Sequence, residues 1–119
     1  MWVKKPDSRQ ILNRLIGGNS VPKIFLKKHI DGKRIVIAAA DEEIIGKEFR
    51  ENNKKLSVTN TFYRGELLEI EKAIEILKNA KNLNIVGHQI VNAAIKAKII
   101  HELGVLTIQG IPHAIKFIL

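Results

Sequence analysis

The stretch KIFLKKHIDGKRIVIAAA, residues 23–40, constrains the fold more strongly than any other part of the sequence. Two runs with the composition of β-strands flank Asp31-Gly32, and both of these residues tolerate the positive φ that tight hairpin turns require. The stretch therefore predicts a β-hairpin with a two-residue turn at Asp31-Gly32. This turn determines which side chains share a face of the hairpin.

The two faces of this hairpin differ in character, because side chains alternate between faces along a strand. The apolar face is expected to be core, and it holds Ile24, Leu26, Ile30, Ile35, Ile37 and Ala39. The other face is expected to be a cationic surface with one aromatic ring set into it, and it holds Lys23, Phe25, Lys27, His29, Arg34 and Val36. Lys28 falls on the apolar face near a strand end, so we expect its ammonium group to reach water along its aliphatic stem.

The rest of the chain alternates between helix and strand patterns. The expected elements after the hairpin are a short helix at 41–49 with Asp41 as its cap, a strand at 56–62, a helix at 66–80, a strand at 83–86, a helix at 88–100, and strands at 105–108 and 114–119. We therefore predict an α/β or α+β fold, in which a mixed β-sheet of five to six strands packs with about three helices.

Residues 1–20 are interpreted as a basic N-terminal extension that precedes a single α/β domain at 21–119. A short helix can start at Asp7 or Ser8 and end at Gly17-Gly18, with an apolar stripe between residues 11 and 16. This stripe makes residues 7–16 a candidate contact for a protein partner. A total of 119 residues agrees with one folded domain.

The net charge of +8 is distributed unevenly along the chain. Residues 1–65 carry 14 Lys and Arg against 7 Asp and Glu, whereas residues 66–119 carry 6 against 5. A one-sided excess of cations attracts polyanions, and RNA, bound through its phosphates, is the commonest candidate in a cell. The alternative is the lysine-rich surface of a thermophile's protein.

Composition excludes several classes of protein. No apolar run approaches the roughly 18 residues of a membrane span, and the first residues lack the apolar core of a signal peptide, so we expect a cytoplasmic protein with no membrane partner. The chain has no cysteine, which excludes disulfides and thiolate ligands. Its four histidines lack metal-ligand spacing and no G-x-S-x-G motif is present, so we expect no metal, no cofactor and no catalytic residue.

The residues expected to contact RNA are cations of the extension and the hairpin together with nearby rings. Adjacent aromatics on a strand point to opposite faces, so of Phe62 and Tyr63 one should be core while the other can stack on a base. The alternative is that both rings pack in the core. The full set is Lys4, Lys5, Arg9, Arg14, Lys23, Phe25, Lys27, His29, Arg34, Tyr63 and Arg64.

A second hypothesis places a pocket around Val86-Gly87-His88. A glycine between a strand and a helix can leave backbone N–H groups free to bind an anion at the positive end of the helix. The alternative is that Gly87 makes only the turn and His88 only caps the helix. With Asp41, Lys47 and His113 beside Gly87, the chain would be a small enzyme or a nucleotide-binding domain.

Four short blocks, ADEEIIGKEF, TFYRGE, LNIVG and GIPHA, follow one another along the chain. Together they resemble the archaeal domain-of-unknown-function family 424, over roughly residues 22–119. The chain departs from the resemblance in its first 20 residues, at His88, where an acidic residue is expected, and at Ile115, where a glutamine is expected.

The resemblance implies an archaeal protein without an assigned reaction, in a setting near translation and RNA metabolism. Combined with the charge distribution, it leads us to expect a basic, non-enzymatic, RNA-associated protein of the archaeal translation machinery. Its expected partner is ribosomal RNA, on the ribosome itself.

Overall fold

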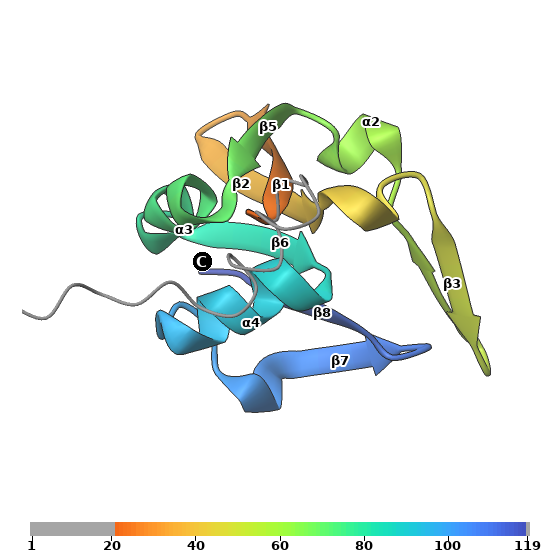
Figure 1. The fold of residues 1–119 in the computed structure, drawn as a ribbon. Helices are drawn as coiled ribbons and strands as arrows, with labels where there is room; N and C mark the ends of the chain where they lie inside the picture. Colours follow the sequence, from red (N-terminus) through yellow and green to blue (C-terminus); the bar gives the residue numbers. More distant parts are fainter. Residues whose placement is uncertain (1–20, 119) are drawn as a thin grey trace, which may run out of the picture.

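The computed structural model describes residues 21–118, and it is built around one mixed sheet (Figure 1). Six strands form this sheet in the order β5-β1-β2-β6-β8-β7, and β3 and β4 form a separate hairpin. The strands are β1 (Lys23–Asp31), β2 (Arg34–Asp41), β3 (Glu48–Glu51), β4 (Lys54–Ser57), β5 (Glu66–Glu69), β6 (Asn82–Val86), β7 (Val105–Ile108) and β8 (Ile111–Lys116). The helices are α2 (Asn60–Tyr63), α3 (Ile70–Lys78) and α4 (His88–Lys96), with short 3₁₀ helices η1 (Glu42–Ile44) and η2 (Glu102–Gly104).

The prediction of a mixed sheet of five to six strands with about three helices is confirmed, and the fold is α+β. The expected extension at residues 1–20 lies outside the described residues, and so do Lys4, Lys5, Arg9, Arg14 and the apolar stripe. Among residues 21–118 no helix has the length and apolar character needed to cross a lipid bilayer.

The β1–β2 hairpin forms as predicted, but its turn lies one residue further along the chain. Asp31 pairs with Arg34, so the turn residues are Gly32 and Lys33, and Gly32 has a φ of +61°. Turns of this kind place glycine at the first central position, which explains why Gly32 takes it. The shift moves each cross-strand partner by two positions, as in Leu26 with Ala39, so the assignment of side chains to faces is unchanged.

One face of the sheet, called here the helix face, is covered by α3 and α4 (Figure 1). Strand residues such as Leu26, Ile37 and Ile85 pack there against Leu77 and Val91 of the helices. Most of the predicted apolar face of the hairpin is therefore core.

The core prediction is wrong for Ile30 and Ile35, which are 70% and 45% exposed. These two residues pair with each other near the hairpin turn. The helix α3 ends at Lys78 and does not reach over this end of the sheet, so the two side chains remain in contact with water.

The opposite face, called here the far face, is covered at its centre by α2 and the β3–β4 hairpin. Ala38, Ala40 and Val86 of the sheet pack there against Leu56 and Tyr63. The prediction that this side of the hairpin is a cationic surface with one aromatic ring set into it is therefore wrong at its centre, where a second core has formed.

Three expected elements differ from the structure for local reasons. The strand predicted at 56–62 ends at Ser57, because Thr59 caps α2 by accepting a hydrogen bond from the Phe62 N–H at 3.1 Å. The helix predicted from residue 66 starts at Ile70, because Glu66–Glu69 pairs with β1 as an edge strand. The short helix predicted at 41–49 is present only as the 3₁₀ helix η1, because residues 48–51 form β3 and pair with β4.

The C-terminal half follows the prediction more closely. The strand predicted at 105–108 is found with those bounds. The last strand begins at Ile111 rather than Ala114, because Pro112 lies within β8, opposite Thr107 of the edge strand β7. The carbonyl of Pro112 faces Gly87, which lies beyond the last β6–β8 pair at Val86 and His113, so the missing N–H removes no bond from that ladder.

Candidate functional site

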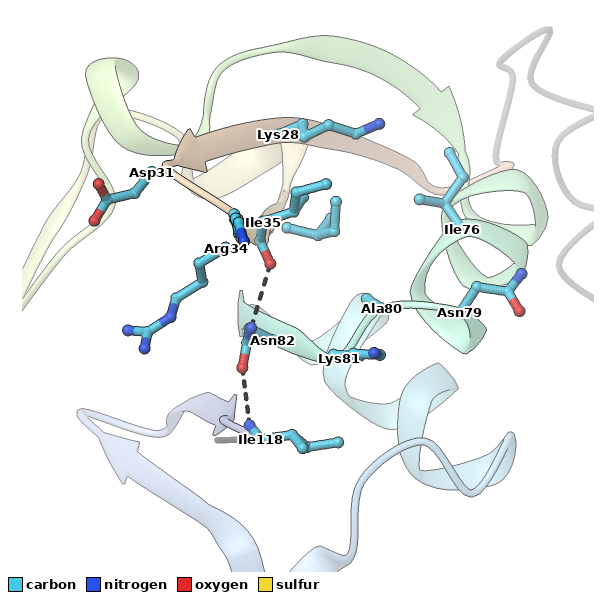
Figure 2. Close-up of a pocket in the computed structure, with 12 residues that line it drawn as sticks. Lys28, Asp31, Arg34, Ile35, Ile76, Asn79, Ala80, Lys81, Asn82 and Ile118 are labelled. Atoms are coloured by element: carbon cyan, nitrogen blue, oxygen red, sulfur yellow. Dashed lines mark hydrogen bonds between the residues drawn. The ribbon is translucent and has the colours of Figure 1, made fainter.

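A surface groove of about 1090 Å³ opens below the tip of the β1–β2 hairpin, where α3 leaves the helix face uncovered (Figure 2). Its apolar floor is formed by Ile35, Ile37, Ile76 and Ala80, and its polar residues include Asn79 and Asn82. The charged residues that line it are the four cations Lys28, Lys33, Arg34 and Lys81 and the single acid Asp31.

The cations of the groove come from three separate segments. Lys28 is on the helix face of β1, Lys33 and Arg34 are at the hairpin turn, and Lys81 follows α3 directly before β6. All four are exposed, so the expectation that Lys28 reaches water is confirmed. Figure 2 shows Lys28 and Lys81 on opposite sides of the groove. An anion inside it would therefore be approached by positive charge from both sides.

Asn82 ties the groove to the C-terminal end of the chain. Its Nδ2 donates to the carbonyl of Ile35 at 3.4 Å and its Oδ1 accepts from the Ile118 N–H at 2.8 Å, as Figure 2 shows. The side chain is only 6% exposed. Buried polar groups of this kind are kept because they are hydrogen-bonded, and this one joins β2, β6 and the residues after β8.

Most residues predicted to contact RNA lie outside this groove, on the far face around α2. Lys27 donates from Nζ to the carbonyl of Thr61 at 2.7 Å, and the His29 ring stacks on Phe62 with centroids 4.5 Å apart. His29 Nε2 also donates to the carbonyl of Phe62 at 2.7 Å. Lys23 lies opposite Glu69 of β5. The side chains of Lys27 and His29 therefore attach α2 to the hairpin, while β5 is held by its backbone pairing with β1.

The two rings proposed for base stacking are both packed inside the protein. Phe25 is 8% exposed and Tyr63 is 3% exposed. The guanidinium of Arg64 lies 5.3 Å from the centre of the Phe25 ring and covers it from outside. Neither ring presents a face to solvent, because α2 closes over this part of the far face.

Among the predicted RNA contacts in residues 21–118, Arg34 alone lines the groove. Lys28, Lys33 and Lys81 were not selected from the sequence. A signal existed for Lys28, whose charge falls on an otherwise apolar face. None existed for Lys81, since only the packing of α3 on the sheet brings it close to the hairpin.

A hydrogen-bonded network joins Tyr63, Asn84 and His113 on the far face. Tyr63 Oη donates to Asn84 Oδ1 at 2.6 Å, and His113 Nε2 donates to the same oxygen at 2.8 Å. These residues lie in three of the four blocks that carry the family resemblance, on α2, β6 and β8. The network therefore attaches α2 to the middle of the sheet.

Burial keeps both titratable members of this network neutral near pH 7. It raises the pKa of Tyr63 to about 12 and lowers the pKa of His113 below its usual value of 6.5. A neutral phenol and a neutral imidazole can donate hydrogen bonds to Asn84 without placing a charge in the second core.

The buried His113 is expected to make the folded protein less stable at acid pH. Because burial lowers its pKa in the folded state, the unfolded chain binds the proton first as the pH falls. The stability that the neutral His113 ring contributes is fully present above the pKa of His113 in the unfolded chain. It is lost as the pH falls through the pKa of His113 in the folded protein. We expect the free energy of unfolding, measured with urea, to decrease from about pH 7 to about pH 5, and to decrease less in His113→Gln.

The control for this measurement is His88→Gln, because His88 is exposed at the start of α4. This variant removes a histidine outside the Tyr63–Asn84–His113 network, so it should change the pH dependence less than His113→Gln does. Identical pH profiles for His113→Gln and the wild type would show that the His113 ring is not held neutral by the fold.

Asp41, Gly87 and His113, the centre of the second predicted pocket, are neighbours in the structure. Ala40, Val86 and His113 lie side by side on β2, β6 and β8, and the Gly87 N–H donates to the carbonyl of Pro112 at 3.0 Å. None of the three lines the groove, and neither does Lys47, which is exposed at the start of the β3–β4 hairpin.

The carboxylate of Asp41 occupies the N-terminus of α4. Its oxygens accept from the N–H groups of Gln89 at 2.8 Å and Ile90 at 2.9 Å, and the residue is 2% exposed. The prediction that Asp41 caps the helix directly after it is wrong, because η1 receives no side-chain cap. The anion expected at the Gly87 corner is therefore supplied by the chain itself.

The protonation of Asp41 reflects two opposing effects. Desolvation by burial raises its pKa, while the hydrogen bonds from Gln89 and Ile90 lower it, and the net shift is upward. Both oxygens are engaged by backbone donors of α4, so their geometry is that of a structural cap rather than a general base.

Residues 21–118 contain no group of three or more His, Asp or Glu side chains arranged to hold a metal ion. The groove supplies amide and ammonium donors, a guanidinium and an apolar floor, with one carboxylate. Such a set of groups can bind an anion next to an apolar group, and it contains no general base paired with a nucleophile.

Comparison with known proteins identifies one family and one similar fold. A family model described as "Protein of unknown function (DUF424)" matches residues 28–119, in agreement with the resemblance carried by the four blocks. No curated protein matches the chain. A crystal structure of an uncharacterized conserved protein from Methanopyrus kandleri is similar with a TM-score of 0.65 and 24% identity, over 82% of this chain and 92% of that one. This structural likeness supports the fold.

Proposed function

Since this chain belongs to the DUF424 family of proteins of unknown function, we propose its function from its own surface: it binds RNA through the phosphate backbone and catalyses no reaction. The expected partner is ribosomal RNA of the archaeal translation machinery. The uneven charge of the sequence supports this proposal, because the first 65 residues hold 14 of the 20 Lys and Arg.

The observation that carries this proposal is the composition of the groove. Four cations and one acid surround it, which is a higher ratio of cations to acids than the 20 to 12 of the whole chain. Opposed cations on the two sides of a groove suit a linear polyanion, whose phosphates can contact both sides in succession. The groove is also open at the surface, so an RNA strand can enter it and leave it without an end being threaded through.

Other features favour binding over catalysis. The candidate acid Asp41 is engaged as a helix cap, and His113 donates its Nε2 proton to Asn84. A catalytic pair requires a group whose lone pair or proton points at a substrate. Structural contacts therefore engage the two central residues of the small-enzyme alternative.

The test is the salt dependence of RNA binding by a groove variant. We expect wild-type protein to bind purified ribosomal RNA and a fluorescein-labelled 12-nucleotide oligouridylate, with an observed affinity that falls steeply with salt. Replacing both Lys28 and Lys81 with Gln should reduce the slope by about 0.7 per lost phosphate contact on single-stranded RNA. The affinity should fall roughly tenfold or more at about 0.1 M salt.

The matched control is the double variant Lys54→Gln with Lys72→Gln. Both residues are exposed and lie outside the groove, and their replacement removes the same charge as the groove variant does. This control should bind RNA with nearly wild-type affinity and slope. A loss as large as that of the groove variant would mean that net charge alone governs binding. A wild-type affinity that is insensitive to salt would refute the proposed function.

A further inference from the structure

The far face of the sheet exposes apolar side chains beyond the area covered by α2. Ile115 of β8 and Leu106 of β7 are 60% and 62% exposed. Phe117, the first residue after β8, is 50% exposed. This surface is the exposed continuation of the sheet on which Asn84 lies, since Asn84 pairs with Ile115.

Phe117 is held at the margin of the cationic groove. The Arg34 guanidinium lies 4.6 Å from the centre of its ring, and the N–H of the next residue, Ile118, donates to Asn82 Oδ1 at 2.8 Å. Arg34, Asn82 and Ile118 all line the groove. The ring is thus positioned by the same residues that form one side of the groove, while half of its surface remains in contact with water.

We infer that Phe117 is the platform on which an unpaired RNA base stacks while the neighbouring phosphates contact the groove, an inference that rests on the proposed function. The Arg34 guanidinium lies over one face of the Phe117 ring, and the exposed half of the ring surface is available to a base. The ring can then stack on the base while the cation attracts the phosphate. The cations beside the ring favour a charged polymer over an apolar segment of a protein. Phe117 thus has the base-stacking role that the sequence suggested for Phe25 and Tyr63, whose rings are buried.

The inference specifies the class of RNA that the site takes. In a duplex both faces of every internal base are covered by neighbouring bases, so no face is free to stack on Phe117. Single-stranded segments, bulges and loops offer free faces. The protein should therefore prefer unpaired RNA, whereas the groove alone would bind paired and unpaired phosphates alike.

The experiment compares two labelled probes with wild-type protein and two Phe117 variants. The probes are a 12-nucleotide oligouridylate and the 12-base-pair duplex that it forms with oligoadenylate. We expect tighter binding of the single strand by the wild type. Phe117→Leu, which keeps apolar bulk but has no ring, should bind the single strand about 5- to 100-fold more weakly, and Phe117→Trp should retain the affinity. The affinity for the duplex should not change.

The control is Ile115→Ala, which removes neighbouring apolar surface without removing a ring and should leave single-strand affinity nearly unchanged. Thermal unfolding of each variant confirms that the fold is intact. Steep salt dependence combined with equal binding of both probes, or wild-type affinity in Phe117→Leu, would overturn the stacking inference and leave the proposed function standing. Absence of salt-dependent binding to either probe would overturn both.

Discussion

Replacing Gly87 with alanine is expected to lower the free energy of unfolding by about 4 kcal/mol. Gly87 has φ +118° and ψ 151°, a backbone region that is almost restricted to glycine. A Cβ atom there would lie 2.3 Å from Cγ of Asp41 and 2.5 Å from one of its oxygens. The carboxylate cannot move aside without releasing the N–H groups of Gln89 and Ile90.

Urea unfolding followed by circular dichroism measures this effect, and a double-mutant cycle separates its two causes. In an Asp41→Ala background the overlap disappears, so Gly87→Ala should then lower stability only by the backbone strain of about 1–3 kcal/mol. Gly104→Ala is the control, because a Cβ there would meet nothing within 4 Å. A Gly87→Ala protein within about 1 kcal/mol of the wild type would contradict the close packing of Gly87 on Asp41.

The second large effect is expected for Asp41→Asn, which should lower the free energy of unfolding by about 3 kcal/mol. The two side chains have the same shape, but the amide nitrogen of asparagine cannot accept a hydrogen bond. One of the N–H groups of Gln89 and Ile90 would therefore lose its partner in a buried position, facing another donor. Hydrogen exchange at these two amides should accelerate together with the loss of stability.

Glu43→Gln provides the control for this substitution. Glu43 is exposed in the adjacent η1 helix, so its replacement removes a negative charge without removing a buried acceptor. Its unfolding free energy should stay within about 0.5 kcal/mol of the wild type. Equal effects of the two substitutions would show that the charge of Asp41 matters and its capping contacts do not.

Elements with local signals could be predicted from the sequence. The β1–β2 hairpin is specified by turn residues and alternation, and the main helices by the spacing of apolar residues such as Leu77 and Val91. Residues 66–69 continue the helical spacing of α3, yet they form an edge strand because β1 lies beside them. No pattern within four residues can reveal such a neighbour.

The sites were harder to predict because they depend on contacts between distant segments. Asp41 caps a helix 48 residues further along the chain, although a local cap was the simpler expectation. The sequence makes Phe25 and Tyr63 candidates for stacking, but both rings are buried beneath the far face, where α2 lies. The groove exists because α3 ends before it covers the hairpin, which is a property of packing rather than of any motif.

The position of β6 in the sheet has a consequence for the order in which the protein folds. The β1–β2 and β7–β8 hairpins can each form from residues that are close in the chain. Within the sheet they are joined through β6. This strand pairs in parallel with β2, between Val36–Ala40 and Asn82–Val86, and it pairs with β8 on its other side. Closing the long loop between β2 and β6 costs conformational entropy before the new strand pairs can compensate for it. The pairing of β6 with β2 is therefore the expected slow step in folding.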